Sequence, residues 1–360
     1  MNGEPAMPIA VATAAAWVAR HEGMTDGEVG ELLTALVDGS CTPEQAVELL
    51  CAWSARGETG AELTAVVRFL LARALPLPPL PPGMDLCGTG GSGLTRFNVS
   101  TTAAFVLGAA GVPVAKHGNK GSGRANGSFD LLDALRVPYA LPPARLAELQ
   151  RRSGVCFLFA RTMHPVVGAL APARKLARAR AARTVFNLAG PLANPSRPLM
   201  QIIGVTNAQS AHVVAEALVR LDAGRTGARA VVVCGHPGLD EVSITGPTNL
   251  WNVQGGHIHH AIIERVHQPG LTHELLPGGD AHENARLFER LLQGEEQGAL
   301  LDLVCTNAGV ALDCWHGRPI LSDGGGFAQA RALIADGAAW AAFARHRELA
   351  TEFHAAQTGA

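Results

Sequence analysis

A glycine-rich segment at residues 85–93 stands between an apolar entry and an Ala-rich run from Thr102 to Gly111. Glycines let backbone N–H groups approach an anion closely, and a helix start adds unpaired N–H donors and the positive end of a dipole. A buried entry followed by such a loop and a helix is typical of a phosphate-binding site. The alternative for a glycine loop taken alone is a plain tight connection.

A second loop of this kind, residues 116–124, follows a short apolar run at 112–115 that is expected to be a strand. Two adjacent loops suit a ligand that carries several phosphates. Further apolar runs at 201–205 and 230–234 alternate with helical stretches. This alternation predicts an α/β fold with a mainly parallel central sheet covered by helices.

The region before these loops is expected to be helical over residues 11–74. Thr42 is a good N-cap because Pro43 and an acidic residue follow it in the first turn. A proline-rich connector at 75–83 then marks the clearest boundary in the chain. At 360 residues the length favours two domains, which we place at 1–76 and 77–360, with a further helical contribution to the first from about 168–185.

Composition narrows the class of protein. Apolar residues make up 48% and charged residues 17% of the chain, as expected of a compact globule, and a net charge of −2 provides no general attraction to nucleic acid or anionic lipid. Seven scattered cysteines without a CxxC pair favour reduced thiols. With no signal peptide or membrane-length apolar run expected, the sequence predicts a cytoplasmic protein.

Several residues are candidates for chemistry, each with an alternative. Asp240 and Glu241 follow the strand expected at 230–234 and could hold Mg²⁺, or be two solvated turn acids. His164 and Arg174 are expected on one helix, where a cation could pair with a substrate carboxylate, and the Ala/Arg-rich segment 171–183 that contains Arg174 is expected to be helical. A solvated basic face is the alternative for the other cations there. A zinc site at 257–260 is disfavoured because no Cys or acidic partner has suitable spacing.

A dinucleotide site is also disfavoured. Gly88, Gly90 and Gly93 match the Rossmann fingerprint loosely, but the acidic residue expected about twenty positions later is missing.

Taken together, an ordered set of segments closely resembles the anthranilate phosphoribosyltransferase family. These segments cover nearly the whole chain: Arg56-Gly-Glu-Thr59, Asp85–Gly91, Phe97–Thr101, Lys116–Asn119, Gly127–Asp130, Phe157–Ala160, His164-Pro165, Arg183–Pro195 and Leu239–Glu241. The resemblance implies a small helical dimerisation domain joined to a larger α/β domain of the nucleoside-phosphorylase type, in a homodimer. It also implies attack by the amino group of anthranilate on C1 of 5-phosphoribosyl 1-diphosphate, with release of pyrophosphate.

Site residues follow from the same resemblance. Those implied to bind substrates are Gly88, Gly91, Ser92, Asn98, Ser100, Thr101, Lys116, His117, Gly118, Asn119, Ser128, His164 and Arg174. Among them Lys116, Asn119 and Arg174 are implied to be catalytic, with Arg174 clamping the anthranilate carboxylate. Ser100 is implied to bind one Mg²⁺, and Asp240 with Glu241 another.

The chain also departs from the family pattern. Ser92 replaces an Asp, Arg96 a Thr and Lys120 an Arg, while Gly123, Arg124 and Asn126 replace serines. These changes bear on donor affinity and acceptor identity more than on the fold. They leave two alternatives: a paralogue that ribosylates another aromatic acid, and a non-catalytic relative that binds nucleic acid through its basic helix.

Overall fold

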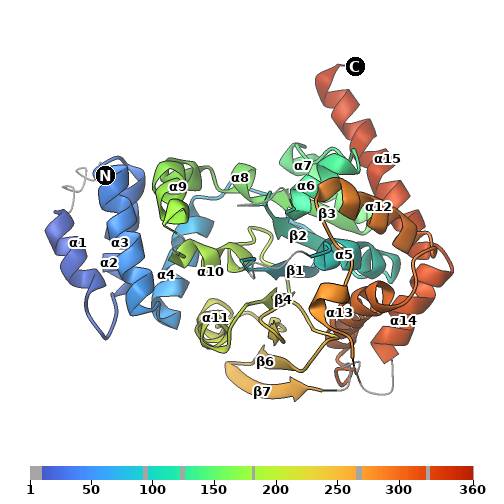
Figure 1. Cartoon of the computed structure of the whole chain (residues 1–360). Helices are drawn as coiled ribbons and strands as arrows, with labels where there is room; N and C mark the ends of the chain where they lie inside the picture. Colours follow the sequence, from blue (N-terminus) through green and yellow to red (C-terminus); the bar gives the residue numbers. More distant parts are fainter. Residues whose placement is uncertain are drawn as a thin grey trace.

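The computed structural model describes residues 10–91, 96–121, 126–180, 183–264, 270–321 and 325–359. Within these ranges, seven strands form one sheet in the order β3-β2-β1-β4-β5-β6-β7 (Figure 1). The strands are β1 Met84–Gly88, β2 Val114–Gly118, β3 Val155–Phe159, β4 Met200–Gly204, β5 Arg229–Gly235, β6 Thr248–Gln254 and β7 His257–Ile263. Strands β1 to β5 run parallel to one another, β6 is antiparallel to β5, and β7 is antiparallel to β6. The expectation of an α/β fold with a mainly parallel sheet is confirmed.

The N-terminal region is helical, as expected. Its helices are α1 Val11–Val18, α2 Asp26–Val37, α3 Pro43–Arg56 and α4 Gly60–Ala72. Thr42 caps α3 by accepting from the Gln45 N–H, with Pro43 in the first turn, so the predicted helix start is confirmed. Threonines at 25 and 59 cap α2 and α4 with the same reciprocal box.

One buried carboxylate joins three of these segments. Glu62 of α4 is 0% exposed, and it accepts hydrogen bonds from the backbone N–H groups of Met24 and Thr59, both at 2.9 Å. The guanidinium of Arg56 binds it at 2.5 Å. Burial by itself raises the pKa of Glu62, but these hydrogen bonds outweigh burial and leave that pKa below its ordinary value. The ion pair therefore holds α3, α4 and the start of α2 together.

The rest of the chain supplies the helices that cover the sheet. They are α5 Val99–Ala109, α6 Ser128–Ala134, α7 Pro143–Ser153, α8 Ala160–Met163, η1 Pro165–Leu170, α9 Ala171–Ala179, α10 Val185–Leu192, α11 Ala208–Leu221, η2 His273–Leu275, α12 Ala281–Leu292, α13 Ala299–His316, α14 Gly325–Ala335 and α15 Ala338–Thr358, where η marks a 3₁₀ helix.

Two details of the helix prediction are wrong. The basic segment expected over 171–183 ends as a helix at Ala179. His164 and Arg174 do not share one helix, because His164 precedes the 3₁₀ turn η1 and Arg174 lies in α9. Pro165 begins η1, and the residue before a proline is pushed out of the helical region.

Hydrophobic cores lie on both faces of the sheet. One surrounds Phe105 of α5, whose ring contacts Phe157, Phe288 and Phe343 with centroids 5.2–5.7 Å apart. The other runs from α1–α4 through α10 and α11 to the opposite face. Alternation along β4 divides them, because Ile202 belongs to the first core and Ile203 to the second. The helical bundle therefore shares its core with one face of the sheet.

All seven cysteines are free thiols. None of the helices in the described ranges has both the length and the apolar composition that crossing a lipid bilayer requires.

Candidate active site

Polar loops meet at the carboxyl edge of the parallel strands. The first glycine loop follows β1, the second follows β2, and Asp240 and Glu241 come shortly after β5. Strand β1 lies between β2 and β4, and β5 is next to β4, so the three segments lie over neighbouring strand ends (Figure 1). This edge is where open α/β sheets bind ligands.

Glycines at the strand ends allow close packing at this edge. A Cβ on Gly88 of β1 would lie 2.2 Å from Asp240 Oδ2, and a Cβ on Gly204 of β4 would lie 1.8 Å from the Asp240 carbonyl oxygen. Gly88 and Gly204 are register partners. Asp240 therefore rests directly on the ends of two adjacent strands, which no larger residue at either position would permit.

We expect Gly204→Ala to destabilise the protein by about 1–3 kcal/mol, the usual cost of forcing extra atoms into a packed site. The atom in the way is a backbone oxygen, which cannot rotate aside. Urea unfolding measures the effect. Gly30→Ala in α2 is the control, since a Cβ there meets nothing within 4 Å and should leave stability equal or slightly higher. Equal stability of the two variants would contradict the seating of Asp240 on β4.

Both carboxylate oxygens of Asp240 have partners in the segment between β1 and α5. The Gly90 N–H donates to Oδ2 at 2.7 Å, and the Arg96 guanidinium forms an ion pair with Oδ1. Burial lowers the pKa of Arg96, but the charges of Asp240 and Glu241 outweigh this and raise it above its ordinary value. Burial raises the pKa of Glu241 to about 7, against the opposing influence of Arg96. The nearby charge of Arg96 therefore does not fully offset the effect of burial on the Glu241 carboxylate.

Lys116 of β2 is buried, with 2% exposure, and its ammonium donates to the Leu86 carbonyl of β1. Beside it lies Asp85, which accepts from Asn194 Nδ2 at 2.8 Å and from the His117 N–H at 3.2 Å. Burial raises the pKa of Asp85 to about 6, although Lys116 opposes this. Lys116 and Asp85 therefore form hydrogen bonds between β1 and β2, close to where the two glycine loops begin.

His117 and His164 are brought together although they lie far apart in the sequence. Their rings pack edge to face with centroids 5.3 Å apart. His117 Nδ1 is 3.1 Å from the Gly190 carbonyl oxygen, and its Nε2 is a buried atom without a hydrogen-bond partner in the described structure. Burial lowers the pKa of His117 to about 3 and also lowers that of His164. The lowered pKa values favour the neutral form of both rings.

Asp130 binds backbone groups in and just after the second glycine loop. Asp130 of α6 accepts the backbone N–H groups of Gly121 and Gly127 on one oxygen, at 2.7 and 2.8 Å. Ser128 Oγ lies 3.4 Å from the Asn119 carbonyl oxygen, and a Cβ on Gly118 would lie 2.4 Å from that hydroxyl. Asn119 and Ser128 are thus held next to each other at the end of β2.

The N-terminus of α5 completes this edge. Asn98 stands at the N-cap, but its side chain makes no capping hydrogen bond, so it leaves N–H donors of the first turn for another acceptor. Ser100 and Thr101 lie in that turn, with Ser100 partly exposed and Thr101 buried. This is the geometry in which a helix start binds an anion.

Asn284 of α12 links the two segments that follow the glycine loops, and it was not among the residues predicted from the sequence. It is 0% exposed, and its Nδ2 lies within hydrogen-bond distance of the Arg96 carbonyl (2.9 Å), Asn98 Oδ1 (2.9 Å) and Asn126 Oδ1 (2.7 Å). Asn126 Nδ2 also donates to the Arg96 carbonyl at 2.8 Å. The available signal was a polar residue on the apolar face of an amphipathic helix, since Ala281, Ala285 and Phe288 share that face.

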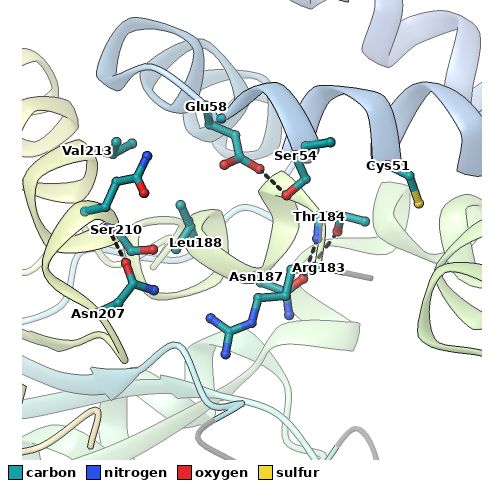
Figure 2. A pocket seen from close by; sticks show the side chains of 13 residues that line it. Cys51, Ser54, Glu58, Arg183, Thr184, Asn187, Leu188, Asn207, Ser210 and Val213 are labelled. Atoms are coloured by element: carbon teal, nitrogen blue, oxygen red, sulfur yellow. Dashed lines mark hydrogen bonds between the residues drawn. The ribbon is translucent and has the colours of Figure 1, made fainter. Parts of the chain in front are cut away.

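Two more positioning residues were missed. Asn307 of α13 brackets Val242, accepting its N–H at 2.9 Å and donating to its carbonyl at 3.0 Å, so it holds the chain next to Glu241. Arg183 donates to the Gly91 carbonyl at 2.8 Å and to Thr206 Oγ1 at 2.9 Å. Arg183 also lines a cavity of about 450 Å³ between α3, α10 and α11 (Figure 2). It therefore connects the wall of this cavity to the first glycine loop.

The remaining predicted residues lie apart or outside the described ranges. Arg174 is half-buried in α9, a helix that packs against α3. Lys120 pairs with Asp133 of α6 at 2.7 Å. Ser92, Gly123 and Arg124 lie outside the described residues. Histidines 257 and 259 are on the exposed strand β7.

The oxygen atoms at this edge of the sheet indicate which metal the site could bind. Carboxylate and hydroxyl oxygens, such as those of Asp240, Glu241 and Ser100, are of the kind that Mg²⁺ prefers. Asp240, however, is already paired with Arg96. Within the described ranges, no group of three or more His, Cys, Asp or Glu side chains is arranged to hold a metal ion by itself. The residues therefore fit a metal that is shared with a ligand, as is usual for Mg²⁺ on phosphates.

Comparison with known proteins gives a consistent result. Residues 80–340 match the model of the glycosyl transferase family, a/b domain. An anthranilate phosphoribosyltransferase from Chloroflexus aggregans is 38% identical over 328 residues, covering 90% of this chain and 94% of the relative. One from Rubrobacter xylanophilus is 38% identical over 330 residues, covering 91% and 94%.

Solved structures agree. The crystal structure of the Thermus thermophilus anthranilate phosphoribosyltransferase has a TM-score of 0.82 at 38% identity and covers 95% of this chain and 99% of that one. The fold is also shared with the Saccharomyces cerevisiae enzyme in complex with PRPP and Mg, at a TM-score of 0.83, 24% identity and coverage of 95% and 98%. On its fold, its matched length and its identity to these relatives, the chain belongs to the anthranilate phosphoribosyltransferase family.

Proposed function

We propose that this protein transfers the phosphoribosyl group of 5-phosphoribosyl 1-diphosphate to the amino group of anthranilate, a step of tryptophan biosynthesis. Family membership supports the reaction. The structural observation that carries it is that one buried amide, Asn284, joins Arg96 and Asn98, which lead into α5 after the first glycine loop, to Asn126, which follows the second. Such an arrangement presents many N–H donors to one ligand with several phosphates.

Donor binding is proposed for the two loops and α5. Breaking the bond between ribose and diphosphate builds positive charge on the sugar ring and negative charge on the leaving group. N–H groups held in place before the reaction stabilise that negative charge without reorganising. One Mg²⁺ bound at Ser100 and another at Asp240 and Glu241 would neutralise further charge on the diphosphate. The ammonium of Lys116 is hydrogen-bonded to the Leu86 carbonyl. Lys116 would therefore stabilise the negative charge of the donor through its positive charge and not through a direct hydrogen bond.

Acceptor binding is proposed for Gly88, Asn119, His117, His164 and Arg174. An aromatic amine is already neutral, so no proton must be removed before it attacks, and the neutral histidine pair does not need to act as a base. Holding the amine in line with C1 of the ribose supplies much of the acceleration. We therefore propose no nucleophilic side chain and no covalent intermediate.

The test is the decay of anthranilate fluorescence when 5-phosphoribosyl 1-diphosphate and magnesium are added, repeated with substituted benzoates. Turnover of anthranilate supports the proposal. Turnover of another aromatic acid alone would instead establish a paralogue with a changed acceptor. Salt-dependent DNA binding without any turnover would identify the non-catalytic alternative.

Arg174→Ala is expected to raise KM for anthranilate by about ten- to a hundredfold, because a charge-assisted hydrogen bond to a carboxylate contributes roughly 1.5–3 kcal/mol. The KM for the donor should stay within about twofold of its value in the unaltered protein. Steady-state kinetics with each substrate varied in turn measures both constants. Lys175→Ala, the exposed neighbour in α9, is the control and should change neither. Equal increases in the two KM values would contradict a role for Arg174 in acceptor binding.

The organisation of the protein is part of the proposal. We assign residues 1–76, with helical contribution from about 168–185, to a domain that pairs two copies in a homodimer, and residues 77–360 to the transferase domain. The apolar helices α1–α4 support this division. We place the protein in the cytoplasm, where free thiols such as its seven cysteines persist.

A further inference from the structure

Arg96 forms an ion pair with Asp240 that is largely buried. The two residues are 144 positions apart, and their side chains are 20% and 5% exposed. The Gly90 N–H donates to the other oxygen of Asp240, so Gly90 and Arg96 together bind both oxygens of this carboxylate. The pair is therefore shielded from water, unlike an ordinary surface salt bridge.

The backbone of Arg96 is fixed as well. Its carbonyl accepts from Asn126 Nδ2 at 2.8 Å and from Asn284 Nδ2 at 2.9 Å. Gly278 packs so tightly on it that a Cβ there would lie 2.6 Å from the Arg96 carbonyl carbon. These contacts come from two separate parts of the chain, Asn126 and the segment 278–284, so the backbone that carries the guanidinium is held in place beside Asp240.

We infer that Arg96 takes the place of a divalent cation at Asp240 in the donor-free protein, so that metal binds tightly only after this ion pair opens. The inference rests on the proposed function, which makes Asp240 and Glu241 the acidic side of the donor site. Both oxygens of Asp240 are already bound, and arginine keeps its charge at any ordinary pH. A cation arriving at Asp240 must displace the guanidinium or sit beside its positive charge. Threonine, which the family resemblance places at this position, would carry no charge.

The consequence is an order of binding. The donor brings a diphosphate whose oxygens can take over the guanidinium, because arginine binds phosphate and carboxylate with the same planar fork. Asp240 is then released to share a metal with that diphosphate. Arg96 is thus a positioning residue that couples metal affinity to the presence of donor.

The test uses Mn²⁺ as the probe, with free Mn²⁺ measured by electron paramagnetic resonance in protein without substrates. We expect Arg96→Thr to bind Mn²⁺ at least about tenfold more tightly than the unaltered protein, since a like charge a few ångströms away is removed. Arg96→Lys keeps the charge and should remain close to the unaltered protein. Lys120→Ala, which removes a cation from the second glycine loop, should leave Mn²⁺ affinity unchanged.

Adding Asp240→Asn to Arg96→Thr should abolish the gain. Equal Mn²⁺ affinity in the Arg96→Thr variant and the unaltered protein would overturn the inference, and so would a gain that survives loss of the Asp240 carboxylate. A thermal unfolding curve for each variant confirms that it is folded. No substrate is present in these measurements, so their failure is distinct from failure of the proposed reaction, which the anthranilate assay detects on its own.

Discussion

Replacing Asn284 by alanine is expected to lower kcat/KM for 5-phosphoribosyl 1-diphosphate by about a hundredfold, mainly through a higher KM. The substitution removes the amide that joins the Arg96 carbonyl, Asn98 and Asn126. Asn98 Oδ1 and Asn126 Oδ1 lose this partly buried donor, while the Arg96 carbonyl keeps the one from Asn126 Nδ2. Each such loss costs about 1–3 kcal/mol, and every 1.4 kcal/mol is a factor of ten in binding. Steady-state kinetics with varied donor measures the effect.

Asn284→Asp sharpens the test. Aspartate has the same shape and still accepts from the Gly279 N–H, a bond that Asn284 makes at 2.9 Å. It has no N–H, so it cannot replace the two hydrogens that the Asn284 amide offers to the acceptors around it. We expect a loss at least as large as with alanine, because a negative charge would also stand beside the proposed phosphate site. His282→Ala, exposed on the same helix, is the control. If both Asn284 variants kept the donor KM of the control, the linking of the loops would not matter for donor binding.

Glu62→Ala is expected to reduce the free energy of unfolding by about 3–5 kcal/mol, the usual cost of removing one partner from a buried ion pair. Arg56 would be left without its counter-charge, and the N–H groups of Met24 and Thr59 would lose their acceptor. The helical bundle shares its core with the sheet, so we expect one cooperative transition at lower urea concentration. Urea unfolding followed by circular dichroism measures the change.

Glu48→Ala provides a matched control in the same bundle. Glu48 also pairs with an arginine, Arg180, at 2.5 Å, but its side chain is 67% exposed. Exposed pairs contribute about 0–1 kcal/mol, so this variant should unfold almost as the unaltered protein does. Similar losses in the two variants would mean that burial is not what makes the Glu62 pair important.

Much of the architecture was predictable because its causes are local. Thr42 and Pro43 start α3 through hydrogen bonds and backbone angles that involve only near neighbours in the chain. The strands expected at 112–115, 201–205 and 230–234 are present as β2, β4 and β5, with ends shifted by a few residues. Asp240 and Glu241 follow β5 as expected, so their place at the carboxyl edge follows from parallel topology.

The helix expected over 171–183 shows the limit of local patterns. Composition alone favoured a longer helix, yet α9 ends at Ala179, and Arg183 instead donates to the Gly91 carbonyl 92 residues away. Tertiary hydrogen bonds decide such a terminus, and helix propensity carries no information about them.

The sequence by itself determined the class of fold, the two glycine loops and the family, because these depend on periodicity, turn chemistry and motif order. The partners of the polar side chains were decided only by the tertiary structure. Asn284 meets Asn98 across 186 residues, and Arg96 meets Asp240 across 144. Chain folding sets these pairings, since a buried amide or carboxylate binds whichever donor or acceptor the packed elements bring within about 3 Å of it.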